Sequence, residues 1–115
     1  MKMLKGNEAA VLDYLKKEIS KSEIKTAILT VDEHRAVLEK IIADNNKENI
    51  KLLSLGSLKD MKTVAHNLFD VLRKCDELGV STILSESFDE SGIGRAIMNR
   101  LKKASGFNII YLGEL

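Results

Sequence analysis

Short apolar runs alternate with longer amphipathic runs along the whole chain, and this pattern predicts five strands and four helices. The strands are expected at residues 2–5, 27–31, 50–55, 80–86 and 107–112. The helices are expected at residues 8–21, 33–43, 57–78 and 91–104. Two of the strand runs, 50–55 and 107–112, lack a regular apolar-polar alternation, which is typical of strands that are buried on both faces.

This strand-helix order indicates an α/β fold. Right-handed crossovers between parallel strands place helices on both faces of one sheet, so we expect a three-layer Rossmann-like sandwich of about five mostly parallel strands. The 115 residues suit one compact domain, 1–115, that can bury an adequate core.

The third helix has the clearest pattern. Its apolar positions recur at helical spacing and are Met61, Val64, Ala65, Leu68, Val71, Leu72, Cys75 and Leu78. Ser57, with Asp60, is expected to cap its start, and Gly79 to end it in a left-handed conformation. Cys75 lies on the apolar stripe and is interpreted as an inert core residue.

The second helix is expected to begin with a capping box. Its sequence signature is Thr30-Val31-Asp32-Glu33. The inner face of this helix is expected to carry Val37, Leu38, Ile41 and Ile42.

The most informative segment is 91–104, in which a turn containing Gly92 and Gly94 leads directly into the fourth helix. Exposed backbone amides at such a junction favour anions. On a helical wheel, one apolar face consists of Ile93, Ala96, Ile97, Leu101 and Ala104. Arg100 falls near the middle of that face, and a charge there needs a partner.

Two explanations of Arg100 remain open. The one we favour is an internal ion pair, with Asp76 or Glu86 as the partner. In the other, Arg100 and its neighbour Asn99 contact a partner domain or an anionic ligand.

Ligands of open α/β sheets bind beyond the carboxyl ends of the strands, where two glycine-containing turns are expected. Gly92-x-Gly94 is only part of a dinucleotide fingerprint, because Ile97 stands where a small residue belongs. Gly56-Ser57 could approach an anion, but a tight turn with a Ser57 cap is the interpretation we favour. Small-anion or nucleotide binding at these turns is therefore the alternative function.

Other chemical sites find little support. His66 and Asp70 lie one turn apart but opposite the apolar stripe, so they are interpreted as solvated. Two histidines and one cysteine give no zinc spacing, and no aspartate ends the third strand as phosphoacceptor chemistry would need. We expect no catalytic residue, no metal and no cofactor in this chain.

Composition narrows the function classes. Apolar residues make up 44% and charged residues 30%, as in an ordinary globular protein, and no run is long enough for a membrane span. The net charge is only +1, and binding to the phosphate backbone depends on many basic residues, so we do not expect direct nucleic-acid binding. The single cysteine fits a reducing compartment, so we expect a cytoplasmic protein without a signal peptide.

A series of motifs in the second half of the chain carries a family resemblance. They are Leu55-Gly56-Ser57, the run 65–69, Leu72-Arg73, the run 76–79 and the run 92–104. In order and spacing, from about Leu53 to Ala104, the chain resembles the C-terminal accessory domain of two-domain threonylcarbamoyl-AMP synthases.

The resemblance implies a role in making threonylcarbamoyladenosine in transfer RNA. In that family, a YrdC-like domain condenses threonine, bicarbonate and ATP into threonylcarbamoyl-AMP and pyrophosphate. The resemblance assigns catalysis, ATP and a divalent cation to that domain, whose motifs and proline-containing linker are missing here. This chain is therefore expected to be an excised or separately encoded domain.

The leading hypothesis is a non-catalytic module that packs against the YrdC-like synthase domain and its linker. The candidate contact residues are Gly56, Ser57, Gly92, Gly94, Asn99 and Arg100. ATP or pyrophosphate remains a candidate ligand of the same turns.

Overall fold

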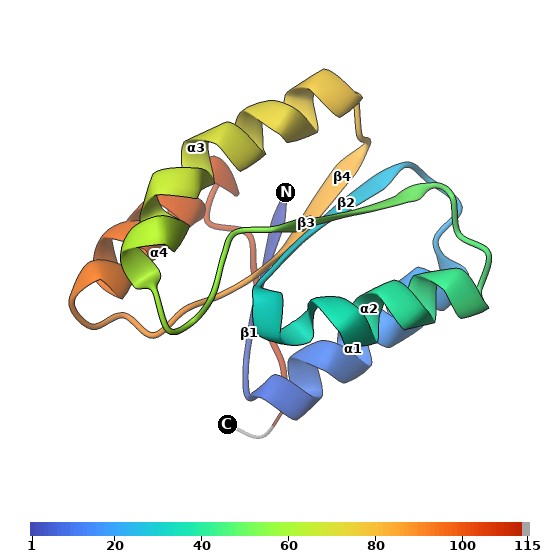
Figure 1. Cartoon of the computed structure of the whole chain (residues 1–115), viewed down its shortest axis with the longest axis horizontal. Coiled ribbons are helices and arrows are strands. Elements are labelled where there is room, and N and C mark those ends of the chain that lie inside the picture. Colours follow the sequence, from blue (N-terminus) through green and yellow to red (C-terminus); the bar gives the residue numbers. More distant parts are fainter. Residues whose placement is uncertain (114–115) are drawn as a thin grey trace.

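The computed structural model describes residues 1–113 and contains five strands alternating with four helices (Figure 1). The strands are β1 (Lys2–Lys5), β2 (Thr26–Thr30), β3 (Ile50–Ser54), β4 (Thr82–Glu86) and β5 (Ile109–Tyr111). The helices are α1 (Glu8–Lys21), α2 (Asp32–Asp44), α3 (Met61–Leu78) and α4 (Ile93–Ala104). The predicted order of elements is confirmed, and the bounds of β1 and α1 agree with the prediction.

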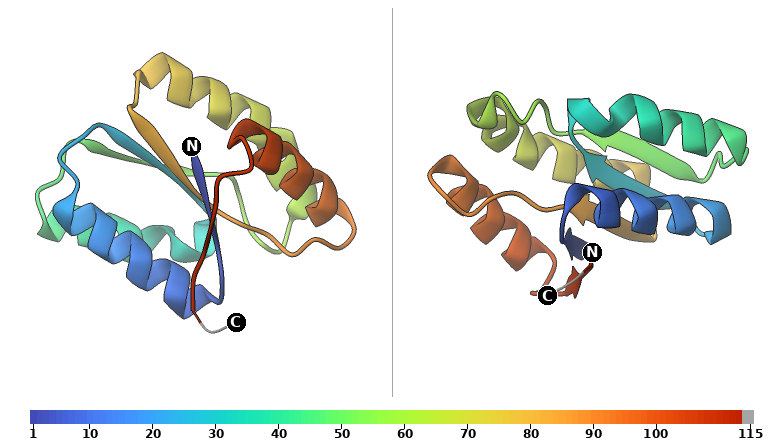
Figure 2. Two further views of the ribbon diagram at one scale, coloured as in Figure 1. Left: turned by 180° about the vertical axis from the view of Figure 1, so that it is seen from behind. Right: turned by 90° about the horizontal axis from the view of Figure 1, so that it is seen from below.

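All five strands are parallel and form one sheet in the order β3-β2-β4-β1-β5. Helices α1 and α2 cover one face of the sheet, and α3 and α4 cover the other (Figures 1 and 2). The predicted three-layer α/β sandwich is confirmed. Strand β4 lies in the centre, between two strands that precede it in the sequence.

Each face of the sheet has its own apolar core. The core under α3 and α4 includes Met3, Leu29, Leu55, Leu68, Cys75, Ile97, Met98 and Leu101. The core under α1 and α2 includes Leu4, Val11, Leu15, Ile19, Ile28, Leu38 and Leu84. Neighbouring strand residues, such as Met3 and Leu4, point to opposite cores, which explains why these strands show little apolar-polar alternation.

The start of α3 differs from the prediction. The helix begins at Met61, and its cap is Asp60, whose carboxylate accepts a hydrogen bond from the Thr63 N–H. Ser57 lies in the loop before the helix, where its hydroxyl donates to Glu33 and accepts from the Lys59 N–H, so it does not cap α3. The predicted end is confirmed, because Gly79 adopts a left-handed conformation with φ of 64°.

The capping box predicted for α2 is also wrong. The cap position is Val31, which has no side-chain acceptor. The Thr30 hydroxyl donates to Glu86, and the Glu33 carboxylate accepts from Ser57. Both side chains of the expected box are therefore used in tertiary contacts, which compete with local capping.

Two apolar faces are rotated from their predicted orientation. In α2, His34 and Leu38 are buried, whereas Val37 is 51% exposed. In α4, the buried residues are Gly94, Ile97, Met98 and Leu101, and Ile93, Ala96, Arg100 and Ala104 are exposed. Burying the large Met98 removes more apolar surface from water than burying two alanines, so this orientation is preferred.

Candidate functional site

Gly94 is required by backbone packing at the start of α4. A Cβ atom built on Gly94 would lie 1.9 Å from the Asp89 carbonyl oxygen. Gly92, at the cap position, has a φ of 54°, and a Cβ there would meet no atom within 4 Å. Close packing of the loop against α4 thus explains Gly94, while backbone conformation explains Gly92.

The Gly56-Ser57 turn already holds an anionic group of this chain. Glu33 Oε2 accepts a hydrogen bond of 2.6 Å from the Ser57 hydroxyl, and Glu33 Oε1 accepts one of 3.0 Å from the Leu58 N–H. The Ser57 hydroxyl, and then the Leu58 amide, hold the pKa of the Glu33 carboxyl below its usual range. An external anion would have to displace Glu33 from these donors.

Arg100 lies on the surface and not in an internal ion pair, so the prediction we favoured is wrong. Its guanidinium carbon lies 3.7 Å from the centroid of the Phe69 ring. Among residues 1–113, no acidic group forms an ion pair with Arg100. Asp76 is exposed, and Glu86 bonds to residues on the opposite face of the sheet.

Two more exposed apolar side chains lie at or just before the starts of the same two helices, and we group them with Arg100 and Phe69 as the α3–α4 patch. The patch consists of Leu58, Phe69, Ile93 and Arg100, and its three apolar members are 44%, 51% and 39% exposed. Leu58 and Ile93 also line a groove of about 370 Å³ with Met61 and Phe88. Exposed apolar side chains beside a free guanidinium are a combination found at protein interfaces.

The remaining sequence candidates are dispersed. Asn99, His66 and Asp70 are exposed, and Asp70 pairs with Arg73 at 3.5 Å. Cys75 is buried as predicted, and burial is the main cause that raises the pKa of its thiol. Gly56 and Ser57 lie in the loop after β3, and Gly92 and Gly94 at the start of α4; Gly94 lines the same groove as Leu58, the residue after Ser57.

The structure contains a buried polar cluster that the sequence analysis missed. Glu86 Oε1 lies 2.7 Å from His34 Nδ1, and Glu86 Oε2 accepts a hydrogen bond from the Thr30 hydroxyl. All three residues are less than 9% exposed. The signals for this cluster were a glutamate as the last residue of a strand and a histidine in the first turn of a helix.

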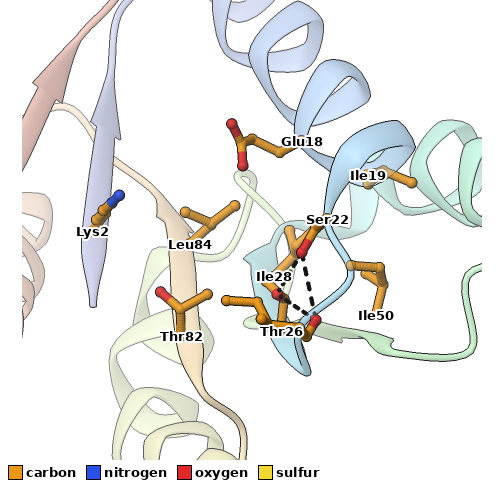
Figure 3. Close-up of a pocket in the computed structure, with 10 residues that line it drawn as sticks. Lys2, Glu18, Ile19, Ser22, Thr26, Ile28, Ile50, Thr82 and Leu84 are labelled. Carbon is orange, nitrogen blue, oxygen red and sulfur yellow. Dashed lines mark hydrogen bonds between the residues drawn. The ribbon is translucent and has the colours of Figure 1, made fainter.

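The cluster borders a pocket of about 160 Å³ at the carboxyl ends of the strands, the edge where open α/β sheets bind ligands. A second pocket, of about 130 Å³, lies at the opposite edge, beside the starts of β2 and β4 (Figure 3). The Ser22 and Thr26 hydroxyls in that second pocket bond to each other and to the Ile24 carbonyl. These two hydroxyls are thus partnered internally.

An ion-pair network ties the loop before α4 to the rest of the domain. Glu90 accepts hydrogen bonds from Lys102 at 2.6 Å and from Lys5 at 3.1 Å. These two contacts, first that with Lys102 and then that with Lys5, hold the pKa of Glu90 below its usual range.

Residues 1–113 contain no group of three His, Cys, Asp or Glu side chains placed to hold a metal ion. In the same range, no helix combines the length and apolar character needed to cross a bilayer.

Residues 1–106 match the family described as the C-terminal domain of threonylcarbamoyl-AMP synthase. The chain belongs to this family. Threonylcarbamoyl-AMP synthase of Pyrococcus abyssi is 41% identical over 90 residues, which cover 69% of this chain. Threonylcarbamoyl-AMP synthase of Bacillus subtilis is 37% identical over 99 residues, which cover 86%. In both cases the chain spans only 26% of the length of the relative.

Solved structures agree with this membership. A variant of Pyrococcus abyssi Sua5 matches with a TM-score of 0.73 at 28% identity, covering 98% of this chain and 31% of that one. The C-terminal Sua5 domain of a hypothetical Pyrococcus horikoshii protein matches with a TM-score of 0.56 at 26% identity. That second match covers 96% of this chain and 93% of the other, so the two units have nearly the same extent.

Proposed function

We propose that this domain is a non-catalytic accessory module of a threonylcarbamoyl-AMP synthase that works in the cytoplasm. It would serve the formation of threonylcarbamoyladenosine in transfer RNA by packing against the synthase domain and its linker. Family membership supports this role, because the matching region makes up about a quarter of relatives named as complete synthases. ATP and a divalent cation would bind to the synthase domain.

The observation that carries the proposal is the α3–α4 patch. Phe69 is half exposed, and Arg100 covers one face of its ring without an acidic partner among residues 1–113. Aromatic and arginine side chains are enriched at the energetically dominant points of interfaces. The synthase domain or linker is expected to offer an apolar pocket for Phe69 and a carboxylate for Arg100.

A domain graft tests this role directly. This chain would replace the matching C-terminal region of the Bacillus subtilis synthase, and the rate of threonylcarbamoyl-AMP formation would be compared with that of the enzyme lacking the region. The covalent link keeps the two domains at a high effective concentration, so weak packing is sufficient. We expect the graft to restore activity.

The double variant Phe69→Ser, Arg100→Ser examines the patch itself. In the graft, its rate is expected to fall to that of the truncated enzyme, while thermal unfolding shows an intact domain. The matched control is Val37→Ser, since Val37 is equally exposed but lies on α2. Full activity of the double variant, or equal loss in the control, would refute docking through the patch.

The alternative, a small-anion or nucleotide-binding domain that acts alone, has weaker support. Its candidate donors at Ser57 and Leu58 are engaged by Glu33. Its other turn, at Gly92, lies close in sequence to Asp89, which forms no ion pair within residues 1–113 and whose negative charge opposes an anion.

A further inference from the structure

The carboxyl-edge pocket has one polar wall and one apolar wall. Glu8, His34 and Ser87 contribute to the polar wall, and Val11, Val31 and Phe88 to the apolar wall. They come from α1, α2 and the segments after β2 and β4, so the fold itself brings them together. The accessory role proposed above does not use this pocket.

The buried pair fixes which nitrogen of His34 carries a hydrogen. Both carboxylate oxygens of Glu86 accept hydrogen bonds, one from Thr30 and one at 2.7 Å from His34 Nδ1. A carboxylate can only accept, so Nδ1 must be the donor. In a neutral imidazole, Nε2 is then an acceptor. The His34 side chain is only 10% exposed, so the surrounding protein fixes the position of Nε2.

Nε2 faces a second acceptor. It lies 3.4 Å from Glu8 Oε1, and no hydrogen bond to Nε2 is found among residues 1–113. When His34 is protonated, its Nε2–H pairs with Glu8; when it is neutral, Nε2 and the Glu8 carboxylate are two acceptors that face each other and repel through their lone pairs. A donor that carries positive charge would satisfy both atoms at once.

The charges around the pocket favour a cation. Glu8 and Glu86 both border it, and no lysine or arginine of residues 1–113 forms an ion pair with either carboxylate. Lys5, at the end of β1, is engaged by Glu90. The size of the pocket limits the ligand, because a cavity of about 150 Å³ holds a molecule as large as benzene.

We propose that this pocket binds a primary ammonium group on a short apolar chain. The ammonium would donate to His34 Nε2 and to the Glu8 carboxylate, and the chain would pack against Val11, Val31 and Phe88. Free alkylamines and lysine side chains share this chemistry. The pocket shares Leu58 and Phe88 with the groove beside the α3–α4 patch, but the two groups that would bind the ammonium, His34 and Glu8, lie outside the patch, so the two proposals can be tested separately.

Titration of the isolated chain with n-butylammonium, followed by amide chemical shifts in NMR, tests the site. We expect saturable shifts at Gly6, His34 and Ser87, with half-saturation in the millimolar range that suits a five-atom ligand. The uncharged 1-butanol and the anionic butyrate are expected to produce no saturable shift there. Linear shifts, or equal responses to all three compounds, would overturn the proposal.

Glu8→Gln is the informative variant, because Glu8 is 70% exposed and its loss leaves the buried pair intact. Binding of n-butylammonium is expected to weaken about tenfold, the effect of one charged hydrogen bond. Glu39→Gln is the matched control on the exposed face of α2 and should bind as the parent does. Unchanged binding by Glu8→Gln would also overturn the proposal.

A parallel titration with N-acetyl-lysine methylamide distinguishes the two sources of the ammonium group. Tighter binding of this compound than of n-butylammonium would identify a lysine side chain of a partner, and the reverse order a free amine. Both orders support the site. Failure of both compounds to bind would contradict it while leaving the domain graft result untouched.

Discussion

The guanidinium of Arg100 lies over the ring of Phe69, 3.7 Å from its centroid, and so joins α4 to α3 at the protein surface. Both side chains are exposed, so solvent screens the interaction. Nothing on the inner side of α4 depends on the charge.

Arg100→Ala is therefore expected to lower the free energy of unfolding by only about 0.5–1 kcal/mol, the range of an exposed cation–π contact. A buried ion pair would lose about 3–5 kcal/mol on the same change. Urea denaturation separates the two cases. A loss above about 2 kcal/mol would mean that Arg100 has a structural role that its exposure does not reveal.

Gly94→Ala, which adds one methyl group, should strongly lower the free energy of unfolding. The new methyl group would overlap the Asp89 carbonyl oxygen, and relief requires movement of the loop backbone. We expect a loss of about 3 kcal/mol. Gly79→Ala is the control: a methyl group there meets no atom within 4 Å, so only the left-handed φ of 64° costs energy, about 1–2 kcal/mol. Equal losses for the two variants would refute the steric explanation.

His34 and Glu86 are expected to be strongly coupled. His34→Phe leaves the Glu86 carboxylate buried without its nitrogen partner, which should cost about 3–5 kcal/mol. The double variant His34→Phe, Glu86→Leu removes both polar side chains of the pair and should be more stable than the sum of the single changes predicts. Chemical denaturation of the four proteins gives the coupling energy, and simple additivity would contradict a buried pair.

Glu90 should contribute to the loss of stability in acid. Its folded-state pKa is lowered by Lys102 and Lys5, so its contribution is complete above the unfolded value of about 4.3. The contribution is lost as the pH falls through the lower, folded value. In Glu90→Gln, the melting temperature should therefore fall less steeply below about pH 4.5 than in the parent protein. Above about pH 6, its dependence on pH should be the same in the two proteins. An unchanged acid slope would show that the network is too solvated to matter.

ATP and pyrophosphate should bind to the isolated domain only in the millimolar range or more weakly. The Glu33 carboxylate occupies the Ser57 hydroxyl and the Leu58 amide, so an anion gains these donors only by displacing it. Isothermal titration calorimetry measures this binding. The comparison is the Glu33→Ala variant, in which the Ser57 hydroxyl and the Leu58 N–H are no longer occupied by the Glu33 carboxylate. Micromolar binding by the parent protein would instead favour the anion-binding alternative.

The sequence predicted the elements well because each has a local cause. The Asn7 side chain caps α1 at the Ala10 amide, and Gly79 ends α3 in a left-handed conformation, and both effects act within a few residues. The predicted starts of the fourth and fifth strands, Val80 and Phe107, are too early. Both residues are apolar, but they precede the hydrogen-bonded ladder and do not belong to it.

The candidate site was harder to predict because its determinants are tertiary. Met98 points inward in α4 and Ala96 does not, because of the space available beneath the helix. The spacing of apolar residues along the sequence carries no information about that space. The His34–Glu86 pair joins residues 52 positions apart, and its formation requires β2 and β4 to be neighbours. Sequence periodicity does not determine that strand order.

The central position of β4 also sets when this domain can fold on the ribosome. Within residues 1–113, strand β1 pairs with β4 and β5, β2 pairs with β3 and β4, and β3 pairs with β2. The first strand therefore has no partner until residues 82–86 have left the exit tunnel. More than three quarters of the chain must therefore be synthesised before the sheet can close, and the β2–β3 pair must wait with one edge and much apolar surface uncovered. Nascent chains that stall before β4 should consequently depend on chaperones more than finished ones.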